Sequence, residues 1–230
     1  MQERSGTWCQ NITNICLQYG IQKPSALINS IPPPKENFKQ NIESRIISFH
    51  ENEQRKKAKT IKRLKYFNLS LLGLSARSHP ALSNLNSVND VKRSRVHIKM
   101  LLGDYYTYEI KSVQSGGDPF CVLCVRNKNE EHIENLHHIL LSCENYSVVR
   151  NNYLEKYKNI LISSNIHFDE MYKNKEEFCQ FILDPTSMNL KKRININDPI
   201  LPEIFKISRN LCHTINNKRL EDLGCRRYQK

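Results

Sequence analysis

Two short stretches decide how this chain is organised: DPFCVLC at 118–124 and HILLSC at 138–143. Two cysteines separated by two residues on a tight turn can present both sulfurs to one ion. His138 and Cys143 are little more than one helical turn apart, so near a helix end both can point at that ion. Zinc prefers four tetrahedral nitrogen and sulfur ligands. The spacing therefore predicts a CCHC zinc site formed by Cys121, Cys124, His138 and Cys143.

Two neighbouring histidines compete with His138 for the third position. His137 lies six residues before Cys143 and His132 lies eleven before it, so helical geometry favours His138. A cysteine pair of this spacing also occurs in redox proteins, but these carry a thioredoxin-like strand–helix unit that the sequence lacks. Four protein ligands leave no position for a reactive water, so we expect a structural site whose binding energy contributes to folding.

Carboxylates near the predicted site raise the alternative of a metallohydrolase. Glu130, Glu131 and Glu134 precede His138 and could supply a general base. Such an enzyme also needs an open coordination position on its metal. Because four good protein ligands are available, we expect no enzymatic activity and no catalytic residue.

Positive charge is concentrated toward the N-terminus. The formal net charge is +12; residues 1–100 hold 17 Lys and Arg against 6 Asp and Glu, and residues 101–230 hold 18 against 17. A basic part beside a neutral part is typical of a protein with a polyanionic partner, usually nucleic acid. A solubilising surface is the alternative interpretation.

The basic residues of interest form two groups. One is the run RKKAKTIKRLK at 55–65, in which seven of eleven residues are basic; the other is a stripe on a helix predicted at 91–102. Like charges at helical spacing repel, and phosphates would neutralise them. Tyr66 and Phe67 directly follow the run and could stack on bases. The alternatives for the run are a solvated helix face and a nuclear import signal. The predicted contacts with RNA or DNA are Arg55, Lys56, Lys57, Lys59, Lys62, Arg63, Lys65, Lys92, Arg95 and Lys99.

Cysteine chemistry depends on the compartment. The N-terminus does not resemble a secretory signal, and no window of about 18 apolar residues could span a membrane. We expect an intracellular protein, nuclear in preference to cytoplasmic, with reduced or metal-bound cysteines. The dispersed cysteines, Cys9, Cys16, Cys179, Cys212 and Cys225, are expected to be ordinary thiols.

Apolar residues recur at three- and four-residue spacings, which predicts a mostly α protein: irregular helical domains with one small CCHC zinc-binding module. Helices are expected at 5–19, from 35 through the basic run as far as 72, and at 91–102, 145–162, 175–183 and 203–223. Trp8 is expected to anchor a core. Asn89 or Asp90 is expected to be the N-cap of the helix predicted at 91–102. The predicted regions are 1–34 (helix and proline linker), 35–110 (basic helical region), 111–146 (zinc module) and 147–230 (C-terminal helices).

The zinc segment, together with Tyr146 and Arg150, resembles the C-terminal zinc segment of LINE-type (non-LTR) retrotransposon reverse-transcriptase proteins. The arrangement is most similar to the chicken-repeat-like branch, in which no RNase H domain follows the polymerase. Looser similarities lie at 60–68, 79–80, 91–106, 182–185, 208–213, 218–219 and 223–224. The gap between Cys124 and His138 is longer than is usual in that family.

This resemblance implies a detached, non-catalytic C-terminal portion of an element protein. The chain has no paired-aspartate polymerase motif, and Asp104 is a lone acid before two tyrosines. The family's tail implies binding of element RNA or target DNA during target-primed reverse transcription, with the upstream polymerase of the same element as a further partner. The rival hypothesis is a zinc-stabilised protein-interaction module derived from such an element.

Overall fold

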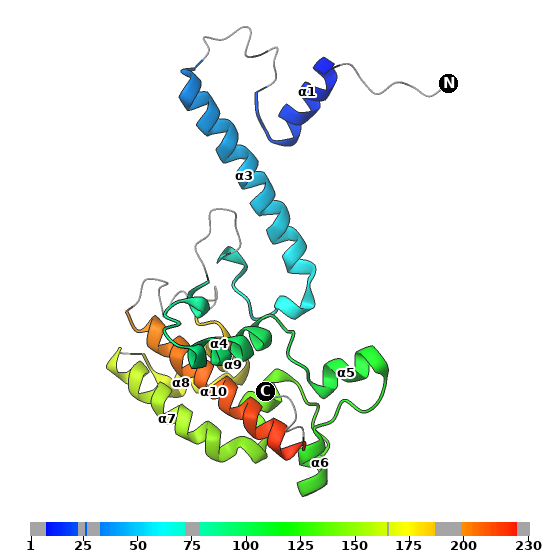
Figure 1. The fold of residues 1–230 in the computed structure, drawn as a ribbon, viewed down its shortest axis with the longest axis vertical. Helices are drawn as coiled ribbons and strands as arrows, with labels where there is room; N and C mark the ends of the chain where they lie inside the picture. Colours follow the sequence, from blue (N-terminus) through cyan, green and yellow to red (C-terminus); the bar gives the residue numbers. More distant parts are fainter. Residues whose placement is uncertain are drawn as a thin grey trace. The chain divides into compact units, whose positions relative to one another are not determined.

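The structure is a computed structural model, and it describes residues 8–22, 26, 33–71, 79–164, 166–186 and 199–224. The chain divides into two compact units, residues 1–60 with 72–76 and residues 61–71 with 77–230. The described residues are mostly helical and contain no sheet, which confirms the predicted fold class (Figure 1). None of the helices described has the length and apolar character needed to cross a bilayer. The four predicted regions stay a prediction; the boundary between the units falls inside 35–110.

The first unit contains helices α1 (Trp8–Gln18) and α3 (Lys35–Thr60). One stripe of α3, from Phe38 to Phe49, is partly buried. Its residues recur at the predicted spacings of four, four and three. The ring of Tyr19, just after α1, packs edge-on against Phe49 with ring centroids 5.0 Å apart. Arg45 of α3 donates a hydrogen bond to the carbonyl oxygen of Gly20. These contacts hold the end of α1 against the middle of α3.

The expectation that Trp8 anchors a core was wrong. Its side chain is 76% exposed. Ile12 and Cys16 of α1, with Tyr19 just after it, form the covered stripe instead, at four- and three-residue steps. A short amphipathic helix covers only one such stripe, and Trp8 lies outside it in the first turn.

The second unit holds most of the described helices. They are α4 (Val88–Leu101), α5 (Tyr108–Ser115), α6 (Val122–Lys128), α7 (Ser147–Ser163), α8 (Phe168–Lys173), α9 (Lys175–Leu183) and α10 (Leu201–Asp222). Short turns join them: η1 (Lys62–Leu64), η2 (Leu69–Leu71), η3 (Pro80–Leu82), the π-helical η4 (His138–Ser142) and η5 (Glu144–Tyr146). Of the predicted helices in this unit, those at 91–102, 145–162, 175–183 and 203–223 are present within a few residues.

Helix α10 is central, and its main contacts are with α4 and α7, which flank it in Figure 1. Pro202 lies in its first turn, where a missing backbone N–H costs nothing. Its buried residues recur at helical spacing, among them Ile204, Leu211 and Ile215. Gly224 follows the last turn with a φ of +71°, as predicted for a glycine that ends a helix.

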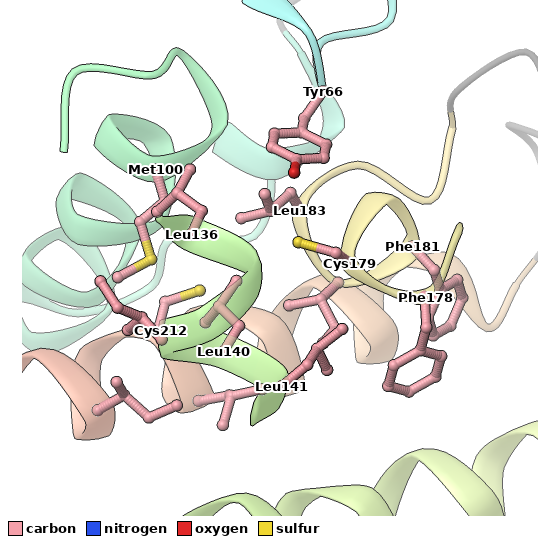
Figure 2. Close-up of a cluster of buried hydrophobic side chains, with 14 of the residues drawn as sticks. Tyr66, Met100, Leu136, Leu140, Leu141, Phe178, Cys179, Phe181, Leu183 and Cys212 are labelled. Atoms are coloured by element: carbon pink, nitrogen blue, oxygen red, sulfur yellow. The ribbon is translucent and has the colours of Figure 1, made fainter. Parts of the chain in front are cut away.

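The core of this unit is apolar and draws on segments far apart in sequence. Figure 2 shows Leu140 and Leu141 of η4 pointing into the space between α9 and α10. Met100 of α4, Phe178 and Phe181 of α9 and other apolar side chains complete the cluster. The segment expected to hold the metal is therefore also part of the hydrophobic core.

The helix predicted to run through the basic segment ends at Thr60. Ile61 adopts an extended conformation with φ −87° and ψ 98°, and η1 follows it. Beyond η1, Tyr66 is 7% exposed and Asn68 is buried, and the amide N–H of Asn68 donates to Asp184 Oδ2 at 2.8 Å. Burying these residues redirects the chain, and repulsion among the lysines weakens any continuation of the helix.

Helix α4 also differs from expectation at its start and on its buried face. Ser87, rather than Asn89 or Asp90, is the N-cap, because its Oγ accepts a hydrogen bond from the Asp90 amide at 3.1 Å. Val91 is exposed, whereas His97 and Met100 are buried. The predicted core side of Val91, Ile98, Leu101 and Leu102 is thus correct in part: Leu101 is buried and Ile98 packs against the core, whereas Val91 and Leu102 are exposed.

Candidate metal centre

The first two cysteines are placed by the start of α6. Cys121 is its N-cap residue and Cys124 lies in its first turn, so both sulfurs lie at the same helix end. A short antiparallel bridge between Phe120 and Ile133 holds this end in place. In that bridge the Cys121 amide donates to the carbonyl oxygen of His132 at 2.8 Å. The charged stretch after Cys124 thus continues α6 and then returns past Phe120 through this single bridge.

The other two residues are placed by the π turn η4. In an α-helix, residues five apart point about 140° away from each other. Here the Cys143 amide donates to the His138 carbonyl oxygen at 2.7 Å, which closes a wider five-residue turn. The Asn135 side chain accepts from the His138 amide at 2.8 Å and fixes the start of the turn. The wider turn lets both side chains face the start of α6.

Cys121, Cys124, His138 and Cys143 form one buried cluster, and their ligand atoms all lie within 4.8 Å of one another. The sulfur of Cys143 is 4.0 Å from that of Cys121 and 3.7 Å from that of Cys124. His138 Nε2 is 3.4 Å from the Cys124 sulfur. Tetrahedral bonds of about 2.3 Å to sulfur and 2.0 Å to nitrogen place neighbouring sulfurs ~3.8 Å apart and sulfur and nitrogen ~3.6 Å apart. The cluster therefore has the donor set and the spacing to bind a metal ion.

A disulfide does not account for this cluster. Bonded sulfurs are about 2.05 Å apart, far closer than these pairs. Cys121, Cys124 and Cys143 are free thiols, as are the buried Cys16, Cys179 and Cys212. The side chain of Cys9 and all of Cys225 lie outside the described residues.

Polar side chains around the cluster support it from a second layer. Asn145 Nδ2 donates to the Cys143 sulfur at 3.6 Å and lies 4.0 Å from the Cys124 sulfur. The buried Arg150 donates from Nη1 to the Cys143 carbonyl oxygen at 3.1 Å. The imidazole of His132 stacks on that of His138, with ring centroids 5.4 Å apart. Such partners fix ligand orientation and stabilise negative charge on sulfur.

Without an ion, the three thiols cannot all ionise. A hydrogen bond with Cys143 and burial raise the pKa of Cys121 to about 12. Burial and the nearby Cys121 raise the pKa of Cys124 to about 11. The hydrogen bond from Cys121 lowers the pKa of Cys143, the thiol most ready to ionise. A bound dication would stabilise all three thiolates.

The structure separates His138 from its competitors. His138 belongs to the cluster, whereas neither His137 nor His132 is a member. His132 is exposed and pairs with Glu130, with Nε2 and Oε2 3.1 Å apart. The four cluster residues are each at most 6% exposed, which describes a closed site.

Glu134 has a structural partner that the sequence did not indicate. Its Oε1 lies 2.6 Å from Nη2 of Arg219 near the end of α10, and both side chains are buried. The same oxygen accepts from the Tyr108 amide at 3.1 Å. Glu134 therefore joins the segment between α6 and η4 to α5 and α10. Nothing in the local sequence around Glu134 indicates this pairing.

The predicted nucleic-acid contacts lie on three elements. Arg55, Lys56, Lys57 and Lys59 are on the last turns of α3, Lys62 and Arg63 are in η1 with Lys65 just beyond, and Lys92, Arg95 and Lys99 are on α4. All are exposed except Arg55, which is half-buried. Three have an acidic partner: Arg55 with Glu51, Lys56 with Glu53 and Lys65 with Glu176. The other seven have no acidic partner within the described ranges.

Of the two aromatic residues after the basic run, Tyr66 cannot serve the role expected of it. Its side chain is buried in the core, because hydrophobic burial is favoured over exposure next to a charged run. The Phe67 ring is half-buried and packs with its centroid 5.0 Å from that of His79. Stacking of Phe67 on a base stays a prediction.

Comparisons with protein-family models, with curated proteins and with solved structures found no match to this chain.

Proposed function

We propose that this chain is a non-catalytic, zinc-stabilised protein that binds RNA or DNA through exposed lysine and arginine side chains. The observation that carries the proposal is the set of seven exposed basic residues that form no ion pair in the described structure, in a chain that also holds a closed Cys3His cluster. Such side chains are available to phosphates, whereas paired ones must first give up a carboxylate.

Zinc is the ion that best suits the cluster. Three thiolates and one imidazole in a tetrahedral arrangement are a common structural zinc set. Burial of all four residues supports a structural role rather than a catalytic one, because water has no position on the ion. Of the carboxylates considered as a general base, Glu134 is engaged by Arg219 and Glu130 pairs with His132.

The resemblance to LINE-type tails gives this binding a biological setting. As part of the proposal, the chain holds element RNA or target DNA in the nucleus during target-primed reverse transcription, beside the polymerase of the same element. The hydrogen bond from Arg150 to the Cys143 carbonyl offers a physical role for one residue of that motif.

The test has two arms, metal content and salt dependence. Elemental analysis of the purified chain should find one zinc per chain, which Cys124→Ser and His138→Ala both lose. Fluorescence anisotropy with labelled RNA and DNA should show affinity falling steeply with salt, with a slope of roughly 0.7–0.9 per phosphate contact.

A charge-matched pair of double variants sharpens the second arm. Lys57→Gln/Lys59→Gln should reduce the salt slope by roughly 1.5, because two phosphate contacts are lost. Lys156→Gln/Lys173→Gln removes the same charge from exposed positions on α7 and α8 and should leave the slope almost unchanged. If both double variants lower the salt slope equally, binding depends on the net charge of the chain and not on the positions of Lys57 and Lys59. Salt-independent or absent binding would favour the rival function, a zinc-stabilised protein-interaction module.

A further inference from the structure

A pocket of about 490 Å³ opens at one end of the second unit, between α4, the segment after it, α6 and α10. This volume is within the range of small-ligand sites, about 300–1,000 Å³. The pocket is separate from the metal cluster, since none of the four cluster residues lines it. Its chemistry is set by basic and aromatic side chains.

The pocket lining carries an excess of positive charge. Arg95 and Lys99 of α4 and Arg126 of α6 are exposed and line it, and no acid pairs with them in the described part of the chain. Among the described residues that line the pocket, Asp104 alone is acidic. Arg219 also lines the pocket, but its charge is balanced by Glu134. Three uncompensated cations against one carboxylate favour a phosphate-bearing ligand.

The pocket also presents an aromatic face. Tyr106 lines it and is 53% exposed. Its neighbour Tyr105 is buried, and its hydroxyl donates to Asn216 of α10 at 3.1 Å, which anchors the backbone beside Tyr106. An anchored, half-exposed tyrosine next to three cations has the composition of a site for unpaired bases, in which the ring stacks and the cations hold the backbone.

We propose that this pocket receives one unpaired nucleotide of a single-stranded nucleic acid, with its base against Tyr106 and its phosphates at Arg95, Lys99 and Arg126. The inference rests on the proposed function and gives it a location and a strand preference. A base inside a duplex is stacked between its neighbours and cannot reach the ring. Tyr106 takes the stacking role that the buried Tyr66 cannot fill.

The experiment uses the full zinc-loaded chain and three labelled probes: a 12-nucleotide RNA, a DNA of the same sequence and its duplex. Tyr106→Ala should weaken binding of the single strands about tenfold, or about 1.4 kcal/mol, as expected for loss of one base–aromatic stack. Duplex affinity should not change. Tyr106→Phe should bind like the wild type, which separates ring stacking from loss of the hydroxyl. Unchanged zinc content and circular dichroism would show that each variant is folded.

The cations are tested by their salt slopes. Arg95→Gln/Lys99→Gln should lower the slope on the single strand by about 1.4, and Lys156→Gln/Lys173→Gln should not. An effect of Tyr106→Ala on one of the two single strands alone would identify that strand as the occupant. If the wild type binds single strands steeply with salt while Tyr106→Ala matches it, the pocket assignment is wrong and the proposed function stands. If the wild type binds none of the probes, both fall.

Discussion

Replacing Glu134 with glutamine should destabilise the second unit strongly, although the change is nearly isosteric. The ion pair with Arg219 has side-chain exposures of 1% and 6% and an N···O distance of 2.6 Å. Glutamine keeps the size of the side chain and can still accept from the Tyr108 amide. It leaves the guanidinium of Arg219 buried without a counter-charge, which costs about 3–5 kcal/mol. The loss should appear as a lower urea midpoint in circular dichroism at saturating zinc.

Two further variants separate charge from packing. Glu203→Gln breaks an exposed pair with Lys206 and should change stability by less than about 1 kcal/mol. The double variant Glu134→Leu/Arg219→Met removes both charges and should recover most of the loss, because a buried pair replaced by apolar groups is often neutral. A Glu134→Gln effect no larger than that of Glu203→Gln would refute the reasoning. A double variant as unstable as the single one would do so equally.

Three other perturbations follow from single positions. Gly103→Ala should lower the free energy of unfolding by about 2 kcal/mol or more, because φ is +64° and a new Cβ would lie 2.5 Å from a backbone oxygen. Gly116→Ala is the control: φ is +75° there but the space is open, so the loss in thermal unfolding should be about 1 kcal/mol. Burial lowers the pKa of His97 from 6.5 to about 4. Between pH 4 and 6.5 the unfolded chain therefore binds more protons than the folded chain. This contribution to stability is complete above pH 6.5 and falls by up to about 3 kcal/mol toward pH 4. His97→Gln, measured at the same zinc concentration, should flatten the curve of stability against pH in this range, and an unchanged curve would contradict the assignment. Asn145→Leu should weaken zinc binding roughly 10- to 100-fold in a chelator competition, and Asn151→Leu on α7 should not.

The metal cluster was accessible to sequence reasoning because its chemistry is local. The ligands come in two pairs, and the two members of each pair lie within six residues of each other in sequence. This spacing lets both members of a pair bind the same ion, and the structure brings all four residues together. His138 rather than His137 is in the cluster, as predicted, but a π turn and not ordinary helical geometry places it there. The π turn itself was not foreseen, since nothing in HILLSC distinguishes a wide turn from an ordinary helix end.

Features that depend on contacts between residues far apart in the sequence were not predicted from it. Glu134 lies in a polar stretch, and its partner is 85 residues away in sequence. The basic helix ends where it does because Tyr66 and Asn68 are buried against residues of α9 and beyond. The short helices α5, α6 and α8 have six to eight residues each, too few for a periodic signal.

The turn η4 places two kinds of stabilisation in one stretch of five residues. Its ends carry two of the four ligands, while Ile139, Leu140 and Leu141 between them are buried in the core. If the proposed zinc ion fills the cluster, its loss would remove the link between the ends of this turn and the start of α6, and would weaken the hold on the three buried side chains between those ends. A cell short of zinc, or one whose thiols are being oxidised, would then expose the chain to proteases. The steady-state amount of the protein would in this way follow the supply of the metal.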